Sequence, residues 1–78
     1  MTLKLISAQE VLFSGEVTQV TLPGTMGEFM VLQNHASLIS TLSAGTIRYV
    51  DAAGTAGSAA IGGGIVDIDS NVVSVCIY

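Results

Sequence analysis

Apolar residues in this chain recur at every second position, and this spacing limits the possible folds more than any other feature. Residues 16–22 show the alternation clearly and are rich in β-branched side chains, which favour a pleated strand. No stretch carries an apolar stripe at the spacing of a helix. The sequence therefore predicts an all-β fold, with further strands at residues 3–5, 11–13, 28–32, 37–42, 46–50, 58–61, 65–68 and 72–77.

Turn-forming residues separate these stretches. Leu22-Pro23-Gly24-Thr25 suits a type II turn, because Pro presets φ at the second position and Gly accepts a positive φ at the third. Ser14-Gly15 is expected to end one strand, and residues 51–54 and 69–71 indicate hairpin connections. Turns about every 8–12 residues are typical of a sandwich or barrel, so we expect one domain over residues 1–78. The side chains expected in its core are Val11, Phe13, Val20, Leu22, Leu38, Ile47, Val73 and Val75.

Charged side chains are scarce, at 10% of the residues, whereas about 25% is usual. Part of the surface is therefore expected to meet a partner. No run of about 18 apolar residues exists, which argues against a membrane-spanning segment. The net charge is −4, and Lys4 and Arg48 are the only basic side chains, so phosphate contacts with a nucleic acid are close to excluded.

The single cysteine and the single histidine limit the chemistry. Cys76 has no partner for an internal disulfide, and the first residues do not resemble a signal peptide, so we expect a reducing compartment. A Cys76–His35 nucleophile pair is conceivable, but a thiol in an apolar strand is usually a small core residue. One His and one Cys cannot complete a four-ligand metal site.

Two other patterns have a simple structural explanation. Asp67 and Asp69 could act as paired carboxylates on one strand face, but acids beside a turn are usually solvated. Gly62-Gly63-Gly64 could form a phosphate cradle, but no Lys-Ser/Thr or helix follows it. Glycines inside a strand pattern instead indicate a bulge or a close approach of chains. No enzyme signature remains, and no cofactor is expected.

The segment from Thr21 to Leu38 resembles the signature of the ATP synthase epsilon family, whose pattern there is approximately T-L-P-G-x-x-G-E-F-G-V-L-P-G-H-A-P-L. The resemblance spans nearly the whole chain. Further similar segments are Leu3 to Ala8, Phe13 to Val17, Ser43 to Arg48, Gly63 to Val66 and Asn71 to Val75.

The resemblance implies a flattened antiparallel β-sandwich of about ten short strands. It also implies a non-catalytic rotor subunit of a proton- or ion-translocating ATP synthase, which joins the gamma shaft to the membrane c-ring. Such a subunit lies peripherally at the cytoplasmic face of the bacterial inner membrane. The residues that match the tip facing the c-ring are Glu28, Met30, Gln33, Asn34 and His35. Those that match gamma-facing positions are Ser7 and Ser40.

The signature segment departs from the family pattern at three places. Met30 replaces a Gly, Gln33-Asn34 replaces Pro-Gly, and Ser37 replaces a Pro. Asn tolerates a positive φ, so Gln33-Asn34 can keep a type II turn. Only alternate members of the apolar group 29–32 can face the core, and the others are expected either at an interface or under a second buried face.

The chain stops at Tyr78, where most family members continue into a two-helix hairpin. Ending on an intact strand favours a naturally short form over a shortened piece, and neither nucleotide binding nor tail-dependent inhibition is then expected. The alternative function is a small β-barrel ligand-binding module. Such modules usually present aromatic residues on an open face, whereas the aromatic residues here are scattered along the sequence. They are Phe13, Phe29, Tyr49 and Tyr78.

Overall fold

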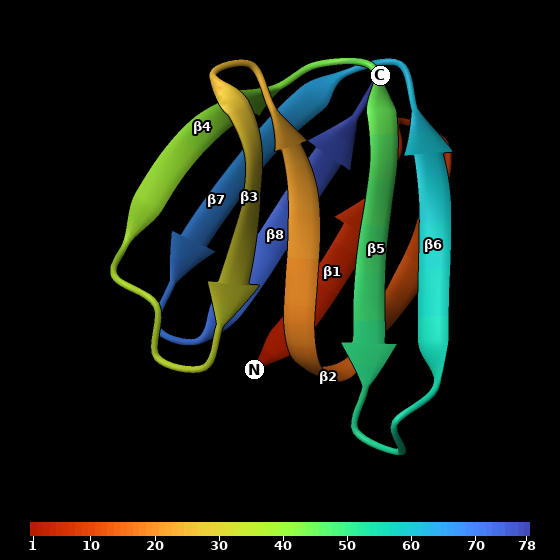
Figure 1. The fold of residues 1–78 in the computed structure, drawn as a ribbon. Helices are drawn as coiled ribbons and strands as arrows, with labels where there is room; N and C mark the ends of the chain where they lie inside the picture. Colours follow the sequence, from red (N-terminus) through yellow and green to blue (C-terminus); the bar gives the residue numbers. More distant parts are fainter.

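The computed structural model describes all 78 residues, which form eight strands and no helix. In chain order the strands are β1 (Thr2–Ile6), β2 (Val11–Gly24), β3 (Gly27–Leu32), β4 (Leu38–Leu42), β5 (Gly45–Asp51), β6 (Ala56–Ile61), β7 (Gly64–Asp69) and β8 (Val72–Ile77) (Figure 1). The all-β prediction is confirmed. No helix has the length and apolar character needed to cross a bilayer.

The long strand β2 belongs to both layers of a sandwich (Figure 1). Its first half pairs with β1, and β8, β7 and β4 follow in that order to complete the first layer. Its second half pairs with β3 on one side and with β5 on the other, and β6 lies outside β5 in the second layer. A single bridge between Gly24 and Leu42 joins β2 to β4, so the two layers are connected at this corner too.

The structure has eight strands, whereas the resemblance implies about ten and the sequence pattern nine. The pattern gives one strand too many because Ser14-Gly15 does not end a strand. Both residues stay in register with β1, where Gly15 lies opposite Leu3 and Ser14 opposite Lys4. Seven of the eight strand pairings are antiparallel, as expected, and β1–β8 is parallel. Both strands of the parallel pair are held by antiparallel neighbours, β2 and β7.

The hairpin between β2 and β3 turns at Thr25-Met26, two residues later than the sequence indicates. Pro23 and Gly24 lie inside β2, so the predicted turn is misplaced. The glycine is needed for packing, because a Cβ at Gly24 would lie 2.8 Å from the Phe29 ring. The predicted hairpin at residues 69–71 is confirmed, and its two central residues, Ser70 and Asn71, have φ of 50° and 63°.

A single cluster of apolar side chains fills the space between the layers. Among the residues predicted to be buried, Val20, Leu22, Ile47, Val73 and Val75 are fully enclosed. Phe13 is half-buried and its ring lies 4.4 Å from that of Tyr49, centroid to centroid. These two aromatic rings are therefore neighbours in space, although they are far apart in the sequence.

Two core predictions are wrong. Val11 is 62% exposed, because the register of β1 and β2 shifts between Leu5 and Ile6 and turns Val11 to the outside. Leu38 is 38% exposed, because it lies at the start of the edge strand β4. Cys76 is also exposed rather than in the core, since it alternates with the buried Val75 along β8.

Candidate partner-binding surfaces

Glu28 and Met30 lie on the outer face of the second layer, where strand alternation places them opposite the buried Val31. Glu28 is paired with Pro23 and Met30 with Thr21. The prediction that only alternate members of the 29–32 group face the core is confirmed, since Val31 is fully buried and Met30 and Leu32 are exposed.

Gln33, Asn34 and His35 lie beyond the other end of β3. A turn closes there through a hydrogen bond from the His35 N–H to the Leu32 carbonyl, with N and O 3.3 Å apart. Asn34 has a φ of 60°, which fits the third position of the expected type II turn. The half-buried His35 ring lies with Nδ1 2.7 Å from the Ala36 carbonyl oxygen.

The structure therefore does not bring the five ring-facing candidates together at one tip. β3 is an extended strand of six residues, and a strand advances about 3.3 Å per residue, so its two ends belong to opposite ends of the sandwich. Glu28 lies beside the β2–β3 hairpin, and Gln33 lies beside the amino terminus (Figure 1). The signature is continuous in the sequence, but the extended strand β3 separates its two halves in space.

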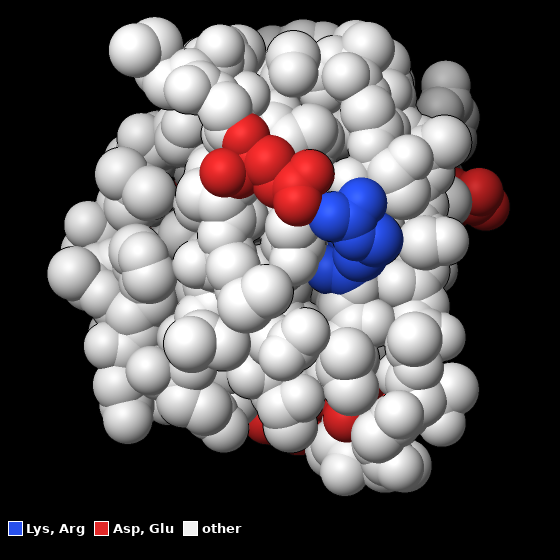
Figure 2. Space-filling model, viewed as in Figure 1, with Lys and Arg blue, Asp and Glu red and all other residues white.

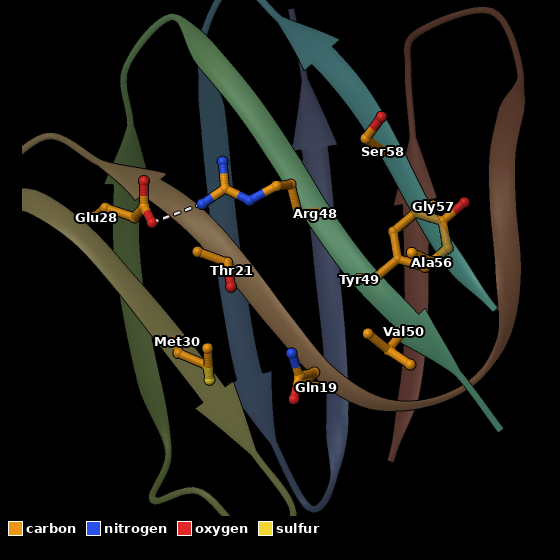
Figure 3. A pocket seen from close by; sticks show the side chains of 10 residues that line it. All are labelled: Gln19, Thr21, Glu28, Met30, Arg48, Tyr49, Val50, Ala56, Gly57 and Ser58. Carbon is orange, nitrogen blue, oxygen red and sulfur yellow. Dashed lines mark hydrogen bonds and ion pairs between the residues drawn. The ribbon is translucent and has the colours of Figure 1, made fainter. Parts of the chain in front are cut away.

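The hairpin end, defined as Thr25, Met26, Glu28 and Arg48, is the first of two separate surfaces. Met26 is 99% exposed at the turn, and Thr25 Oγ1 lies 2.8 Å from Thr41 Oγ1. Arg48 on β5 reaches across Thr21 and donates a 2.7 Å hydrogen bond to Glu28 (Figure 3). Met26 and Arg48 are not among the sequence-predicted contact residues, although an apolar residue at a hairpin turn is a usable signal.

A shallow hollow of about 550 Å³ adjoins this ion pair on the outer face of the second layer. Gln19, Thr21, Met30 and Val50 line it together with small residues of β6 (Figure 3). Figure 2 shows one acidic and one basic group in contact on this face, which is otherwise nearly free of charged side chains. No group of three or more His, Cys, Asp or Glu side chains in the structure could hold a metal ion.

The outer apolar row, defined as Val11, Ile6, Cys76 and Ile65, is the second surface. Each of these residues is paired with the next one on the neighbouring strand, in the strand order β2, β1, β8 and β7. They therefore form a continuous band on the outer face of the first layer. Val11, Cys76 and Ile65 are exposed. A contiguous exposed apolar band in a soluble domain usually marks a protein contact.

The two gamma-facing candidates, Ser7 and Ser40, do not lie on one surface. Ser7 directly follows Ile6 and so adjoins the outer apolar row, where its backbone N–H bonds to the Glu10 carbonyl. Ser40 is paired with the fully buried Val66, and directly paired residues share a face, so Ser40 lies on the core-facing side of β4.

Glu16 is the one group with a resolved pKa shift. The Thr2 hydroxyl donates a 2.6 Å hydrogen bond to its carboxylate, and the α-ammonium of Met1 lies 3.2 Å from its Oε2. These two neighbours, the hydroxyl first, hold the pKa of Glu16 below its usual value.

Together, the fold and the two surfaces define a small β-sandwich domain with exposed apolar patches, which is a class that contacts other proteins. Residues 1–77 match the family described as ATP synthase, Delta/Epsilon chain, beta-sandwich domain. The chain therefore belongs to this family, as the resemblance of its signature segment indicates.

Curated relatives agree with this assignment. The ATP synthase epsilon chain of Campylobacter curvus is 45% identical over 71 residues, covering 91% of this chain and 55% of the relative. That of Wolinella succinogenes is 41% identical over 75 residues, covering 96% and 57%. This chain thus spans little more than half the length of these relatives.

Solved structures share the fold. A chain in the cryo-EM structure of the Euglena gracilis mitochondrial ATP synthase (OSCP/F1/c-ring) superposes with a TM-score of 0.89 at 25% identity, over 96% of this chain and 48% of that one. A chain in the central stalk/c-ring structure of the Tetrahymena thermophila mitochondrial ATP synthase superposes with a TM-score of 0.79 at 14% identity, over 99% and 62%. The second likeness shows the fold alone.

Proposed function

We propose that this chain is a non-catalytic part of the rotor of an ATP synthase, which joins the gamma shaft to the c-ring and couples ion flow to ATP synthesis. The observation that carries the proposal is the match of residues 1–77 to the family. Two separate exposed surfaces on one rigid sandwich support it, because a connecting subunit has to hold two partners at once. The protein would then lie peripherally at the cytoplasmic face of a bacterial inner membrane, as part of the complex.

The hairpin end is the proposed contact with the c-ring. Of the five ring-facing candidates, Glu28 and Met30 lie at or near this end. The polar groups of Gln33 and Asn34 are instead used inside the protein, since Gln33 accepts a hydrogen bond from the amino terminus and Asn34 bonds to Asn71. Met26 is free of such bonds and almost fully exposed, which suits a residue that meets a partner.

The outer apolar row is the proposed contact with gamma. Covering its apolar side chains removes them from water, which stabilises the contact by roughly 25 cal/mol per Å² of apolar area buried. Ser7 at its margin keeps its proposed gamma-facing role, whereas the position of Ser40 on the inner side of β4 does not support one. The two proposed contacts lie on different sides of the molecule, because the row is in the first layer and the hairpin end in the second.

Site-directed crosslinking in the assembled enzyme tests the proposal. Cys76 is the only cysteine, so the natural chain already carries a probe in the outer apolar row, and it is expected to crosslink to gamma. In a Cys76→Ser background, Met26→Cys is expected to crosslink to the c-ring, and Asn34→Cys serves as the matched control at the other end. Ring crosslinks from Asn34→Cys alone would show the reverse orientation. Failure of the chain to copurify with gamma and the ring would overturn the rotor function.

A further inference from the structure

The amino-terminal group of Met1 occupies a built polar site. Its α-nitrogen donates to Gln33 Oε1 at 2.9 Å and to Glu16 Oε2 at 3.2 Å. The two acceptors come from the β3–β4 connection and from β2, which are distant in the sequence. A positively charged donor between a carboxylate and an amide oxygen forms hydrogen bonds of the stronger, charge-assisted kind.

The residue that carries this group is itself held tightly. Met1 is 7% exposed, and its side chain belongs to the apolar core. Its carbonyl accepts a 2.8 Å hydrogen bond from the Val17 N–H, and the Thr2 N–H donates a 2.9 Å bond to the Asn71 carbonyl. The position of the α-nitrogen is therefore fixed by packing and by backbone bonds on both sides.

The same site ties the amino terminus and β2 to two connections of the sandwich, β3–β4 and β7–β8. Gln33 starts the β3–β4 connection, and the Asn34 N–H next to it donates a 2.7 Å bond to the Asn71 side chain in the β7–β8 turn. The Asn71 amide donates back to Asn34 Oδ1 at 3.1 Å. We call this set of Met1, Glu16, Gln33, Asn34 and Asn71 the clamped end.

We propose that the clamped end is a binding site for a free primary α-ammonium, so that in a chain beginning at Met1 the unmodified amino terminus acts as a structural ligand. An acyl group or a preceding residue would replace the ammonium with an amide, which has a single N–H and no charge. One of the two acceptors would then lose its donor. The added atoms would also have to fit beside the Glu16 and Gln33 oxygens, which lie 3.2 and 2.9 Å from the nitrogen, and the β3–β4 connection would loosen. This inference is independent of any partner protein.

Amine chemistry on the full chain tests the proposal. Lys4 is the only lysine, so Lys4→Arg leaves the α-amino group of Met1 as the only primary amine. The probe is acetylation by an active ester at one pH, with and without urea, followed by intact mass, which also reports that Met1 is present. Because bonds to charged groups are among the stronger ones, acetylation of the folded chain is expected to be slower than that of the unfolded chain by at least about tenfold. Equal rates would overturn the proposal.

A double-mutant design gives a second, independent readout. One glycine added before Met1 keeps the Met1 side chain and removes the ammonium, and Tm is expected to fall by about 5 °C. Glu16→Gln is expected to lower Tm in the starting chain and to have a much smaller effect in the extended chain. Glu10 is another exposed acid, so Glu10→Gln is the matched control. It is expected to leave the Tm of both the starting chain and the extended chain unchanged. Equal effects of Glu16→Gln in both chains, or an unchanged Tm on extension, would overturn the proposal.

Discussion

The two ends of the sandwich use the same stretch of sequence in opposite ways. At the hairpin end, Met26 is almost fully exposed, and Glu28 has one exposed partner, Arg48. At the clamped end, Gln33 and Asn34 are committed to internal hydrogen bonds with Met1 and Asn71. Residues that are close in a signature can therefore have different roles, one set left free for a partner and one set used to close the fold.

The largest expected effect comes from the strand that links the two ends. Leu22 is fully buried in the second half of β2, and Leu22→Ala is expected to cost about 2–5 kcal/mol of unfolding free energy through lost transfer energy and a cavity. That loss is a large part of the total stability of a small domain. Urea unfolding measures it, with Met26→Ala as the exposed control. An unchanged midpoint would show that the two ends do not depend on a common core.

The clamped end should be sensitive to backbone conformation. Asn34 has a φ of 60°, where a side chain with a Cβ is strained unless it can bond locally, so Asn34→Ala is expected to cost about 1–2 kcal/mol. Asn34→Gly accepts the positive φ and loses only the hydrogen bond that the Asn71 amide donates to Asn34 Oδ1, so it should cost less. Thermal unfolding of both variants makes the comparison. Both variants lose the same bond from Asn71, so if Gly is as damaging as Ala, the positive φ at position 34 does not strain the folded chain.

Acid should weaken the clamped end before the hairpin end. The folded-state pKa of Glu16 is lowered below 4.5, so its contribution to stability is fully present above the unfolded value and is lost as the pH falls through the folded one. The protection of the Thr2 and Asn34 amides against exchange, taken relative to the intrinsic rate at each pH, is expected to fall below about pH 4.5 more than that of the Glu28 and Phe29 amides. The Glu16→Gln chain should lack this pH dependence. The same dependence in that chain would assign the loss to another carboxylate.

The smallest stability effects are expected at the hairpin end. The Glu28–Arg48 pair is more than half exposed on both sides, so Arg48→Gln should change the unfolding free energy by about 0–1 kcal/mol. Met26→Ala should leave it unchanged within roughly 0.5 kcal/mol, because the side chain contacts little. Both substitutions are nonetheless expected to weaken binding to the c-ring in copurification. A clear loss of stability with normal binding would reverse the contrast between the two ends.

The proposed contact surfaces could be predicted from the sequence only in part. The signature segment identified the family, and strand alternation correctly predicted that only alternate members of the 29–32 group face the core, as Val31 does. The outer apolar row was not foreseen, because its members come from four strands and are aligned only by pairing. Cys76 and Val11 were predicted to be buried, and both lie in that row, since period-two spacing separates two faces without saying which one is covered.

The sequence alone determined that the chain is all-β, that the 69–71 turn forms and that a positive φ falls on Asn34, because each of these depends on local spacing or local backbone preference. Tertiary structure decided that β2 runs unbroken through Gly15, that β1 and β8 pair in parallel, and that Met1 lies between Glu16 and Gln33. These features depend on which distant segments meet. Hydrogen bonding and burial over the whole molecule decide which distant segments pair, and a short stretch of neighbouring residues does not carry this information.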